Sequence, residues 1–512
     1  MISDARTHGS ELRERADVCV IGSGAGGAVV ASELAAAGRS VVLLEQGHHW
    51  TSAQFTQREE EMLPRLFEEA GMRETVDGGV IVLQGRNVGG STVHNLCYAF
   101  RTPPAILALW RREHGLPELT DAALGPCFER VEKRLKVKQI LESEVNALNR
   151  IVRKGCDALG YSGFVARHNR ENCIQAGYCI LGCSYDAKQS MLVTYVPSAD
   201  QAGARIYANA RAERIELERG RARRVLGHAV DGAGRSFGRI EVTAKVVVLS
   251  AGAVASPDLL LRSEIANSSG QVGRNLHLHP SVMAAGVFDE DFHPYRGIPQ
   301  SYYVDEFIDL ERDPHRGVIL MPITGFPVLT SVNLPGFGRA HYEHMRTFSR
   351  TAGLLALLHD ASSGRVVPGK SLSKPEIHYA LEADDARQLG EGLVHCVEVL
   401  HAAGARRVLV PYRDASLELR PGDDLGAIRR RGVKLGEIPV ASTHPQSTCR
   451  MGGDPATSVV GAFGESHDVP GLFLADMSVF PTSLAAPPQI TTAALADRTA
   501  GHILDRWDEL GR

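Results

Sequence analysis

The stretch Val18-Cys-Val-Ile-Gly-Ser-Gly-Ala-Gly-Gly27 decides the fold class of this 512-residue chain. Its short apolar strand runs directly into glycines, an alanine-rich helix follows as far as Gly38, and Ser40–Glu45 is a second apolar strand that ends in an acid. A strand, a glycine turn, a helix and a second strand within about 30 residues are typical of the βαβ unit that opens a dinucleotide-binding domain. The stretch therefore predicts a Rossmann-type α/β domain.

The glycines of this turn have separate roles. Gly22 permits the tight turn from strand to helix, Gly24 lets the backbone approach a pyrophosphate, and Gly27 lets the helix pack close to the strand. The N-terminus of the helix offers N–H groups and a positive dipole end to phosphates. Glu45 falls near the spacing of an acid that accepts a hydrogen bond from a ribose hydroxyl. The turn predicts a bound dinucleotide, and glycines alone do not separate FAD from NAD.

The composition is that of an ordinary globular protein. Hydrophobic residues make up 44% and charged residues 23% of the chain, and the net charge is only -4. No basic tract alternates with aromatic residues, so we expect no nucleic-acid partner. Residues 1–16 lack the apolar core of a secretory signal, and no uncharged apolar run reaches the roughly 18 residues that span a bilayer. We therefore expect a cytoplasmic protein without a membrane span.

The rest of the chain indicates a second, different domain inserted into the first. Residues 240–250 and 471–476 are further buried strands, and a helix is expected over about 490–504. Between 285 and 440, aromatic residues, prolines and alternating segments favour an antiparallel sheet with added helices. One of these helices is a long amphipathic segment over 384–404.

Five motifs further along the chain resemble those of the glucose–methanol–choline (GMC) oxidoreductases. In order, they are 85–95 (GRNVGGSTVHN), 252–257 (GAVASP), 444–452 (HPQSTCRMG), 476–481 (DMSVFP) and 487–491 (PPQIT). The resemblance runs from about residue 17 to 500 and includes features of the cholesterol oxidase and long-chain alcohol oxidase-like branch. It is weakest in the middle of the chain, where this family usually selects its substrate.

The resemblance implies FAD as the cofactor and a particular domain organisation. We expect an α/β fold with a discontinuous Rossmann-type FAD-binding domain and an α+β substrate domain built on an antiparallel sheet. The predicted boundaries are 12–110, 165–285 and 441–512 for the FAD-binding domain, 286–440 for the substrate-binding domain, and 111–164 for a helical connection.

The same resemblance implies which residues contact the cofactor. Gly89 and Gly90 let a loop lie flat against the isoalloxazine, and Ser91 and Asn95 contact the flavin or its phosphates. Three positions elsewhere are implied in addition: Asp476 beside the ribityl–phosphate segment, the backbone near Gln489 at the flavin pyrimidine, and the backbone of Ala212 at the adenine.

His94 stands where most members of the family have an aliphatic residue. Choline oxidase-like members carry a histidine in a similar run, and there it is bonded to the C8 methyl of the flavin. Two interpretations stay open for His94: an 8α-histidyl link to FAD, or a histidine that packs against the dimethylbenzene ring without a bond.

His444 is the predicted catalytic residue, because it occupies the family's histidine position. Histidine has a pKa near 6.5, which suits a general base that removes the hydroxyl proton during hydride transfer. The family normally has a second histidine or an asparagine further along, where this chain has Pro487, which has no side-chain donor or acceptor. Three explanations remain open: His444 suffices, another side chain from the substrate domain substitutes, or the reaction is not ordinary alcohol oxidation.

Three of the nine cysteines, Cys173, Cys179 and Cys183, lie close together in sequence. An iron–sulfur cluster would be one use of them, although ferredoxin-type spacing is absent. A zinc site would need a fourth ligand such as His168. The interpretation that we favour is a tight loop with buried thiols or one local disulfide, and hence no metal site.

The function that these observations predict is FAD-dependent oxidation of an alcohol to a carbonyl by hydride transfer to flavin N5, with His444 as the general base. The partners would be a small-molecule alcohol and either oxygen or another electron acceptor. Two alternatives differ in class: a flavin-dependent lyase or isomerase without net redox, and an FAD redox subunit with a cysteine-bound iron–sulfur cluster. The sequence leaves the substrate and the oligomeric state open.

Overall fold

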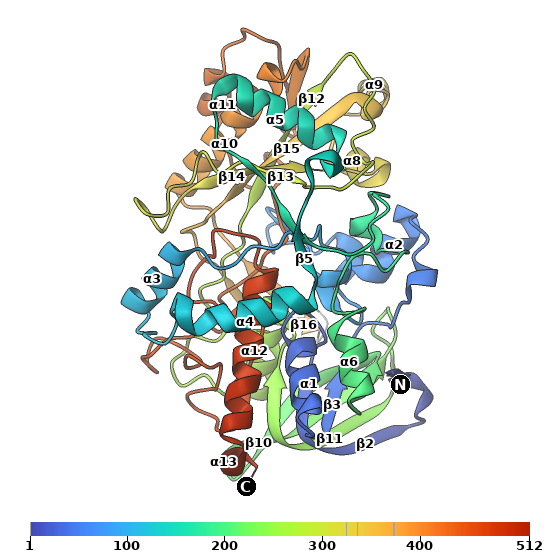
Figure 1. The fold of residues 1–512 in the computed structure, drawn as a ribbon, viewed down its shortest axis with the longest axis vertical. Coiled ribbons are helices and arrows are strands. Elements are labelled where there is room, and N and C mark those ends of the chain that lie inside the picture. The colour runs from blue at the N-terminus through green and yellow to red at the C-terminus, as the bar shows by residue number, and fades with distance from the viewer. Residues whose placement is uncertain (1, 324, 335, 372–373, 512) are drawn as a thin grey trace.

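A computed structural model describes residues 2–323, 325–334, 336–371 and 374–511. The chain forms two bodies around two large sheets (Figure 1). The lower body in the figure contains both termini and an eight-stranded sheet, and the upper body contains a seven-stranded sheet. No helix within the described ranges combines the length and the apolar character needed to cross a bilayer.

The eight-stranded sheet is built around the glycine-turn unit. Its strands, in spatial order, are β1 (Ile2–Asp4), β8 (Arg205–Ala208), β3 (Val41–Leu44), β2 (Glu11–Ile21), β11 (Ser236–Leu249), β10 (Arg221–Val230) and β9 (Ala210–Glu218), and β21 (Leu472–Leu474) also pairs with β11. The pairings from β1 through β11 and β21 are parallel, whereas β10 and β9 join in antiparallel fashion. The sheet is therefore mixed, with a parallel Rossmann-like core.

Helices cover this sheet because its central strands are apolar on both faces. All four residues of β3 are buried, as expected of a parallel strand that has helices on its two sides. Helix α1 (Gly27–Ala36) packs against α6 (Tyr195–Gln201) and α12 (Gln489–Asp505), and α12 packs against α4 (Asp121–Arg134). The predicted strand–turn–helix–strand unit and the C-terminal helix are confirmed.

The seven-stranded sheet forms the second body. Its main strands are antiparallel and follow the order β14 (Val318–Ile323), β15 (Thr351–Leu358), β12 (Ser281–Val287), β18 (Arg407–Val410) and β19 (Leu417–Leu419). Helix α10 (Ala383–Ala402) packs on β15 and β12 and against α5 (Ala147–Leu159). The antiparallel sheet and the long amphipathic helix that the sequence predicts are confirmed.

Two short strands from distant parts of the chain complete this sheet. β20 (Ala441–Ser442) pairs with β12, and β4 (Ile81–Val82) pairs with β20. The predicted domain boundaries stay a prediction, and they assign β4, β20 and the first residues of β12 to the FAD-binding domain. These strands pair within the second sheet because backbone hydrogen bonds join segments by proximity, whatever their order in the chain. They bring the loop after β4 and the segment after β20 to the junction of the two bodies.

Shorter elements complete the fold. The remaining helices are α2 (Glu59–Leu66), α3 (Pro104–Glu113), α7 (Gly252–Ser263), α8 (Pro327–Asn333), α9 (Arg339–Met345), α11 (Gly426–Arg431) and α13 (Trp507–Leu510). The remaining strands form three two-stranded pairs: β5 (Val137–Gln139) with β7 (Arg167–Asn169), β6 (Phe164–Val165) with β13 (Tyr302–Tyr303), and β16 (Arg365–Ser371) with β17 (Lys374–His378).

Candidate active site

A cavity of about 490 Å³ is lined by elements of both bodies. This volume lies within the usual range of small-molecule and cofactor sites. Of the thirteen site residues that the sequence predicts, all except Gly27 and Gly89 line it: Gly22, Gly24, Glu45, Gly90, Ser91, His94, Asn95, Ala212, His444, Asp476 and Gln489. Pro487 lines it as well. The tertiary structure thus brings together positions that span more than 450 residues of sequence.

The glycine turn requires glycine at its close contacts. A Cβ on Gly27 would lie 2.0 Å from the carbonyl oxygen of Gly22, so this residue lets α1 begin directly against the turn. Gly22 itself has a φ of 96°, which disfavours other residues. A Cβ on Gly90 would lie 2.8 Å from Cα of Gly24, so two glycine-containing loops face each other across the floor of the cavity.

Glu45, at the end of β3, organises this turn. Its buried carboxylate accepts hydrogen bonds from the backbone N and the hydroxyl of Ser23, at 3.0 and 2.7 Å, and from the backbone N of Gly47 at 2.8 Å. Burial raises the pKa of this carboxyl. The hydroxyl of Ser23 accepts in turn from the backbone N of Gly89, at 2.9 Å. Glu45 therefore joins the glycine turn to the 85–95 loop, and its predicted contact with a ribose stays a prediction.

Asp476 has a similar structural position at the end of β21. It is buried, and its carboxylate accepts from the backbone N of Gly252 at 2.8 Å, from the hydroxyl of Ser256, and from the backbone N of Ser478 at 2.8 Å. These bonds join the start of α7 to the C-terminal motif beside the cavity.

The residues around the 85–95 loop fit a large bound cofactor. Ser91 accepts from the backbone N of Gly85 at 2.8 Å, and the side-chain amide of Asn95 donates to that of Gln489. Nε2 of Gln489 and Nε2 of His94 are buried and have no hydrogen-bond partner among the described residues. Since buried polar atoms in native proteins are nearly always paired, these two atoms fit a ligand that supplies their partners.

His94 itself is held against an aromatic ring. Its ring centroid lies 3.8 Å from that of Phe67, and the side chain is buried. Burial lowers the pKa of His94 to about 3, so the ring is neutral at physiological pH.

Lys188 supports the backbone just beyond this loop. Its buried ammonium group donates to the carbonyl oxygens of Val93, Asn95 and Cys179, at 2.8, 2.6 and 2.7 Å. The thiols of Cys179 and Cys97 are hydrogen-bonding partners, and Cys97 also lines the cavity. No local pattern in the sequence indicates that Cys97 lies beside Cys179, because 82 residues separate the two.

The other cysteines show no ligand geometry. All nine are free thiols, and the described part of the chain contains no group of three or more His, Cys, Asp and Glu residues arranged to hold a metal ion. Nε2 of His168, which a zinc site would have needed, lies 3.0 Å from the carbonyl oxygen of Gln300.

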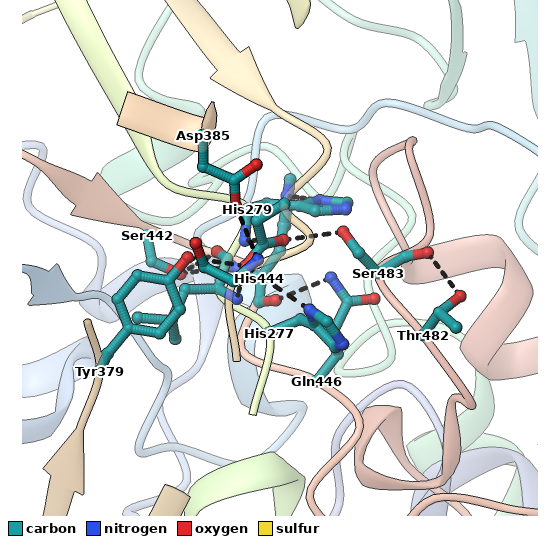
Figure 2. A network of polar contacts seen from close by, with 12 residues as sticks. His277, His279, Tyr379, Asp385, Ser442, His444, Gln446, Thr482 and Ser483 are labelled. Carbon is teal, nitrogen blue, oxygen red and sulfur yellow. Dashed lines mark hydrogen bonds and ion pairs between the residues drawn. The ribbon is translucent and has the colours of Figure 1, made fainter. Parts of the chain in front are cut away.

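His444 lies just after β20 and lines the cavity with a half-buried side chain. Its Nδ1 is 3.3 Å from Nδ1 of His279, and the two rings are nearly perpendicular (Figure 2). Enclosure by the protein lowers the pKa of His444 to about 4, so the ring is neutral at pH 7.

Strand pairing explains how the two histidines meet. β12 and β20 pair at Ser281 and Ala441, and antiparallel pairing resumes, shifted by one residue, in the bridge between His277 and Gln446. His279 and His444 therefore lie opposite each other. His279 was not among the site residues predicted from the sequence. The signal for it is the pair of histidines in the run His277-Leu-His279-Pro280, directly before an apolar strand.

A buried carboxylate, Asp360, holds this region in place. One of its oxygens accepts from the backbone N of His279 and the hydroxyl of Ser483, at 3.2 and 2.8 Å. The other accepts from the backbone N of Leu278 and the hydroxyl of Tyr379, both at 2.9 Å. Burial opposes ionisation of Asp360, but the side chain of His277, 3.8 Å away, together with His279 and the backbone hydrogen bond from Leu278, outweighs it and holds the pKa of Asp360 well below the usual range.

Comparison with known proteins identifies the class of this fold and then the family. The family model for an NAD(P)-binding Rossmann-like domain matches residues 20–85, in agreement with the glycine turn. The two family models for GMC oxidoreductases match residues 63–281 and 361–496. The chain belongs to the GMC oxidoreductase family, which makes it an FAD-dependent oxidoreductase, and the prediction of family and fold class is confirmed.

Individual relatives support the same assignment. An uncharacterised GMC-type oxidoreductase of Mycobacterium tuberculosis (Rv0492c) is 32% identical over 94% of this chain and 75% of its own length. A long-chain-alcohol oxidase of Arabidopsis thaliana (FAO3) is 30% identical over 96% of this chain and 68% of its own length. The crystal structure of pyridoxine 4-oxidase from Mesorbium loti covers 96% of this chain and 99% of its own, with a TM-score of 0.68 and 20% identity, which is a likeness of fold.

Proposed function

We propose that this protein oxidises an alcohol group to a carbonyl by hydride transfer to flavin N5, with His444 acting on the substrate hydroxyl. The observation that supports this best is that His444 borders the same cavity as the glycine turn and the 85–95 loop. FAD, when bound, supplies the two-electron oxidant of the family. The lowered pKa of His444 keeps its ring neutral at pH 7, so the ring can exchange a hydrogen bond with the substrate hydroxyl.

The protein's own residues bind and orient. The glycine turn and the start of α1 would hold the pyrophosphate, and the orphaned Nε2 of Gln489 would hydrogen-bond the flavin ring. Pro487 has no side-chain donor or acceptor, so its side chain cannot hydrogen-bond a substrate. Of the two positions that the family uses for catalysis, the one that carries a polar side chain in this protein is that of His444.

The substrate class that we propose is an alcohol with an apolar body. Apolar side chains of the second sheet line the cavity: Met283, Met321, Ile323, Leu355 and Leu357. Transfer of an apolar group from water into such a lining is favourable. The name of the long-chain-alcohol oxidase relative is consistent with this class.

We also propose that His94 is the site of covalent FAD attachment. Its ring is neutral, and its buried Nε2 has no partner among the described residues, so this nitrogen can act as the nucleophile of an 8α-histidyl link. Forming the N–C bond would replace a C–H bond of the C8 methyl, release a proton and leave the flavin reduced by two electrons, which oxygen or another electron acceptor would then remove. Acid-precipitated protein should keep its yellow colour, and the His94→Ala variant should lose it to the supernatant. Colour lost from both proteins would contradict the covalent link and leave the packed, unbonded histidine.

Anaerobic mixing of the purified holoprotein with a series of alcohols tests the proposed reaction. We expect the flavin absorbance near 450 nm to bleach, as in flavoproteins generally, with longer aliphatic alcohols effective at lower concentrations. A lyase or isomerase without net redox would convert substrate while its flavin stays oxidised, so conversion without bleaching would favour that alternative. Reoxidation with air or with an artificial acceptor then separates an oxidase from a dehydrogenase.

A further inference from the structure

The paired rings of His279 and His444 define where the proton of His444 lies. A neutral histidine carries one ring proton, on Nδ1 or on Nε2, and donates only from the protonated nitrogen. His444 has Nδ1 directed at His279, and its Nε2 has no partner among the described residues. Because His279 does not line the cavity and His444 does, Nε2 is the nitrogen left to meet a substrate.

The backbone of Ala485 determines the protonation of His279. The Ala485 N–H donates to Nε2 of His279 at 3.2 Å, and a backbone N–H cannot act as an acceptor. Nε2 of His279 is therefore unprotonated. His279 is fully buried and its pKa is well below the usual value, which keeps the ring neutral and its single proton on Nδ1. Nδ1–H of His279 then donates to Nδ1 of His444.

We infer that His279 is a positioning residue that keeps the proton of His444 on Nε2, so that His444 donates a hydrogen bond to the substrate oxygen. This inference rests on the proposed alcohol oxidation and changes one role in it. A general base needs an unprotonated nitrogen facing the substrate, and the opposite tautomer would place an N–H of His279 against the N–H of Ala485. The second histidine expected near Pro487 is thus replaced by one that lies behind His444 rather than beside the substrate.

The surrounding contacts hold both partners of this arrangement together. Asp360 accepts from the backbone of His279 and from the hydroxyl of Ser483, two residues before Ala485. The ring that accepts and the N–H that donates are consequently tied to the same carboxylate. His279 also has a φ of 47°, in the region that favours glycine, so its backbone is kept there by these contacts.

His444 keeps its ring proton throughout the proposed reaction. The carbinol C–H bond breaks, its hydride reduces the flavin, the C–O bond becomes a carbonyl, and the hydroxyl proton passes to water. Nε2–H of His444 stabilises the negative charge that develops on the oxygen once that proton leaves. Hydrogen-bond donors aimed at developing charge are among the largest contributions to catalysis.

Substitutions at His444 separate a donor from a base. The side-chain amide of glutamine can present an N–H near the place of Nε2, but it cannot accept a proton at neutral pH. We expect His444→Ala to slow anaerobic flavin reduction about 100-fold, in line with removal of one such donor. His444→Gln should recover at least about tenfold of that loss. A glutamine variant as slow as the alanine variant would overturn the donor role.

The tautomer itself can be observed independently of activity. Holoenzyme labelled with ¹⁵N-histidine should show His444 as the Nε2–H form in long-range ¹H–¹⁵N spectra, assigned by its absence in His444→Gln. His279→Asn, whose amide can still donate, should keep that form alone, whereas His279→Leu, which cannot donate, should show exchange between the Nε2–H and Nδ1–H forms. An Nδ1–H form in the wild type would overturn the inference. Should no alcohol reduce the wild-type flavin while the Nε2–H form is present, the proposed function fails and the tautomer assignment stands.

Discussion

Removal of the Asp360 carboxylate should destabilise the junction of the two bodies. Each of its oxygens accepts two hydrogen bonds, from two backbone N–H groups and two hydroxyls in all. In Asp360→Ala the hydroxyls can rotate towards other acceptors, but the N–H groups of Leu278 and His279 cannot. A buried donor without a partner costs about 1–3 kcal/mol, so two such donors predict a loss of about 2–6 kcal/mol in the free energy of unfolding.

Asp360→Asn provides a graded comparison. The asparagine amide keeps one oxygen as an acceptor, but its NH₂ group faces two donors. We therefore expect the free energy of unfolding to fall, by less than in the alanine variant. Asp289→Ala is the matched control, because Asp289 is exposed and forms its ion pair with Arg406 on the surface. Surface ion pairs contribute little to stability.

Urea unfolding of the three variants, followed by circular dichroism and by flavin fluorescence, measures these differences. The alanine variant should unfold at a clearly lower urea concentration, and its flavin fluorescence should change in the same transition. If Asp360→Ala unfolds at the same urea concentration as Asp289→Ala, the hydrogen bonds of Asp360 do not hold the site together and the reasoning is wrong.

Three further predictions concern cofactor binding and pH. Gly90→Ala places a Cβ 2.8 Å from Cα of Gly24 and at a φ of 56°, so the FAD content of the purified protein, measured from its flavin absorbance, should fall clearly, and an unchanged content would contradict the close approach of the loops. Lys188→Met removes the donor to three carbonyls, which should lower the melting temperature by several degrees and reduce the FAD content of the purified protein; if both stay as in the wild type, the lysine is dispensable. Three buried histidines have folded pKa values of about 3 to 4: His94, His168 and His359. Because the unfolded chain binds protons first, each should reduce the free energy of unfolding by up to about 1.4 kcal/mol per pH unit as the pH falls from about 6.5 towards 4, and a stability that is flat over this range would refute the effect.

The sequence by itself determined the features that depend on residues close together along the chain. The turn from Gly22 to Gly27 predicts its own strand, helix and second strand, since turn geometry and apolar periodicity are local properties. The same holds for α10, whose apolar face repeats at helical spacing, and for the family motifs. The glycine turn with its acid, these motifs and the resemblance at Ala212 together predicted eleven residues that the cavity gathers.

The tertiary structure alone decided which distant groups touch. No local pattern indicates that β4 and β20 complete the second sheet, or that this pairing sets His279 behind His444. Asp360 reaches the site across about eighty residues of sequence, and its four hydrogen bonds exist only once both strands and the segment at Ser483 are in place. Contacts of this kind depend on packing of the whole chain, which is why the sequence could predict a catalytic histidine but not the ring that determines where its proton lies.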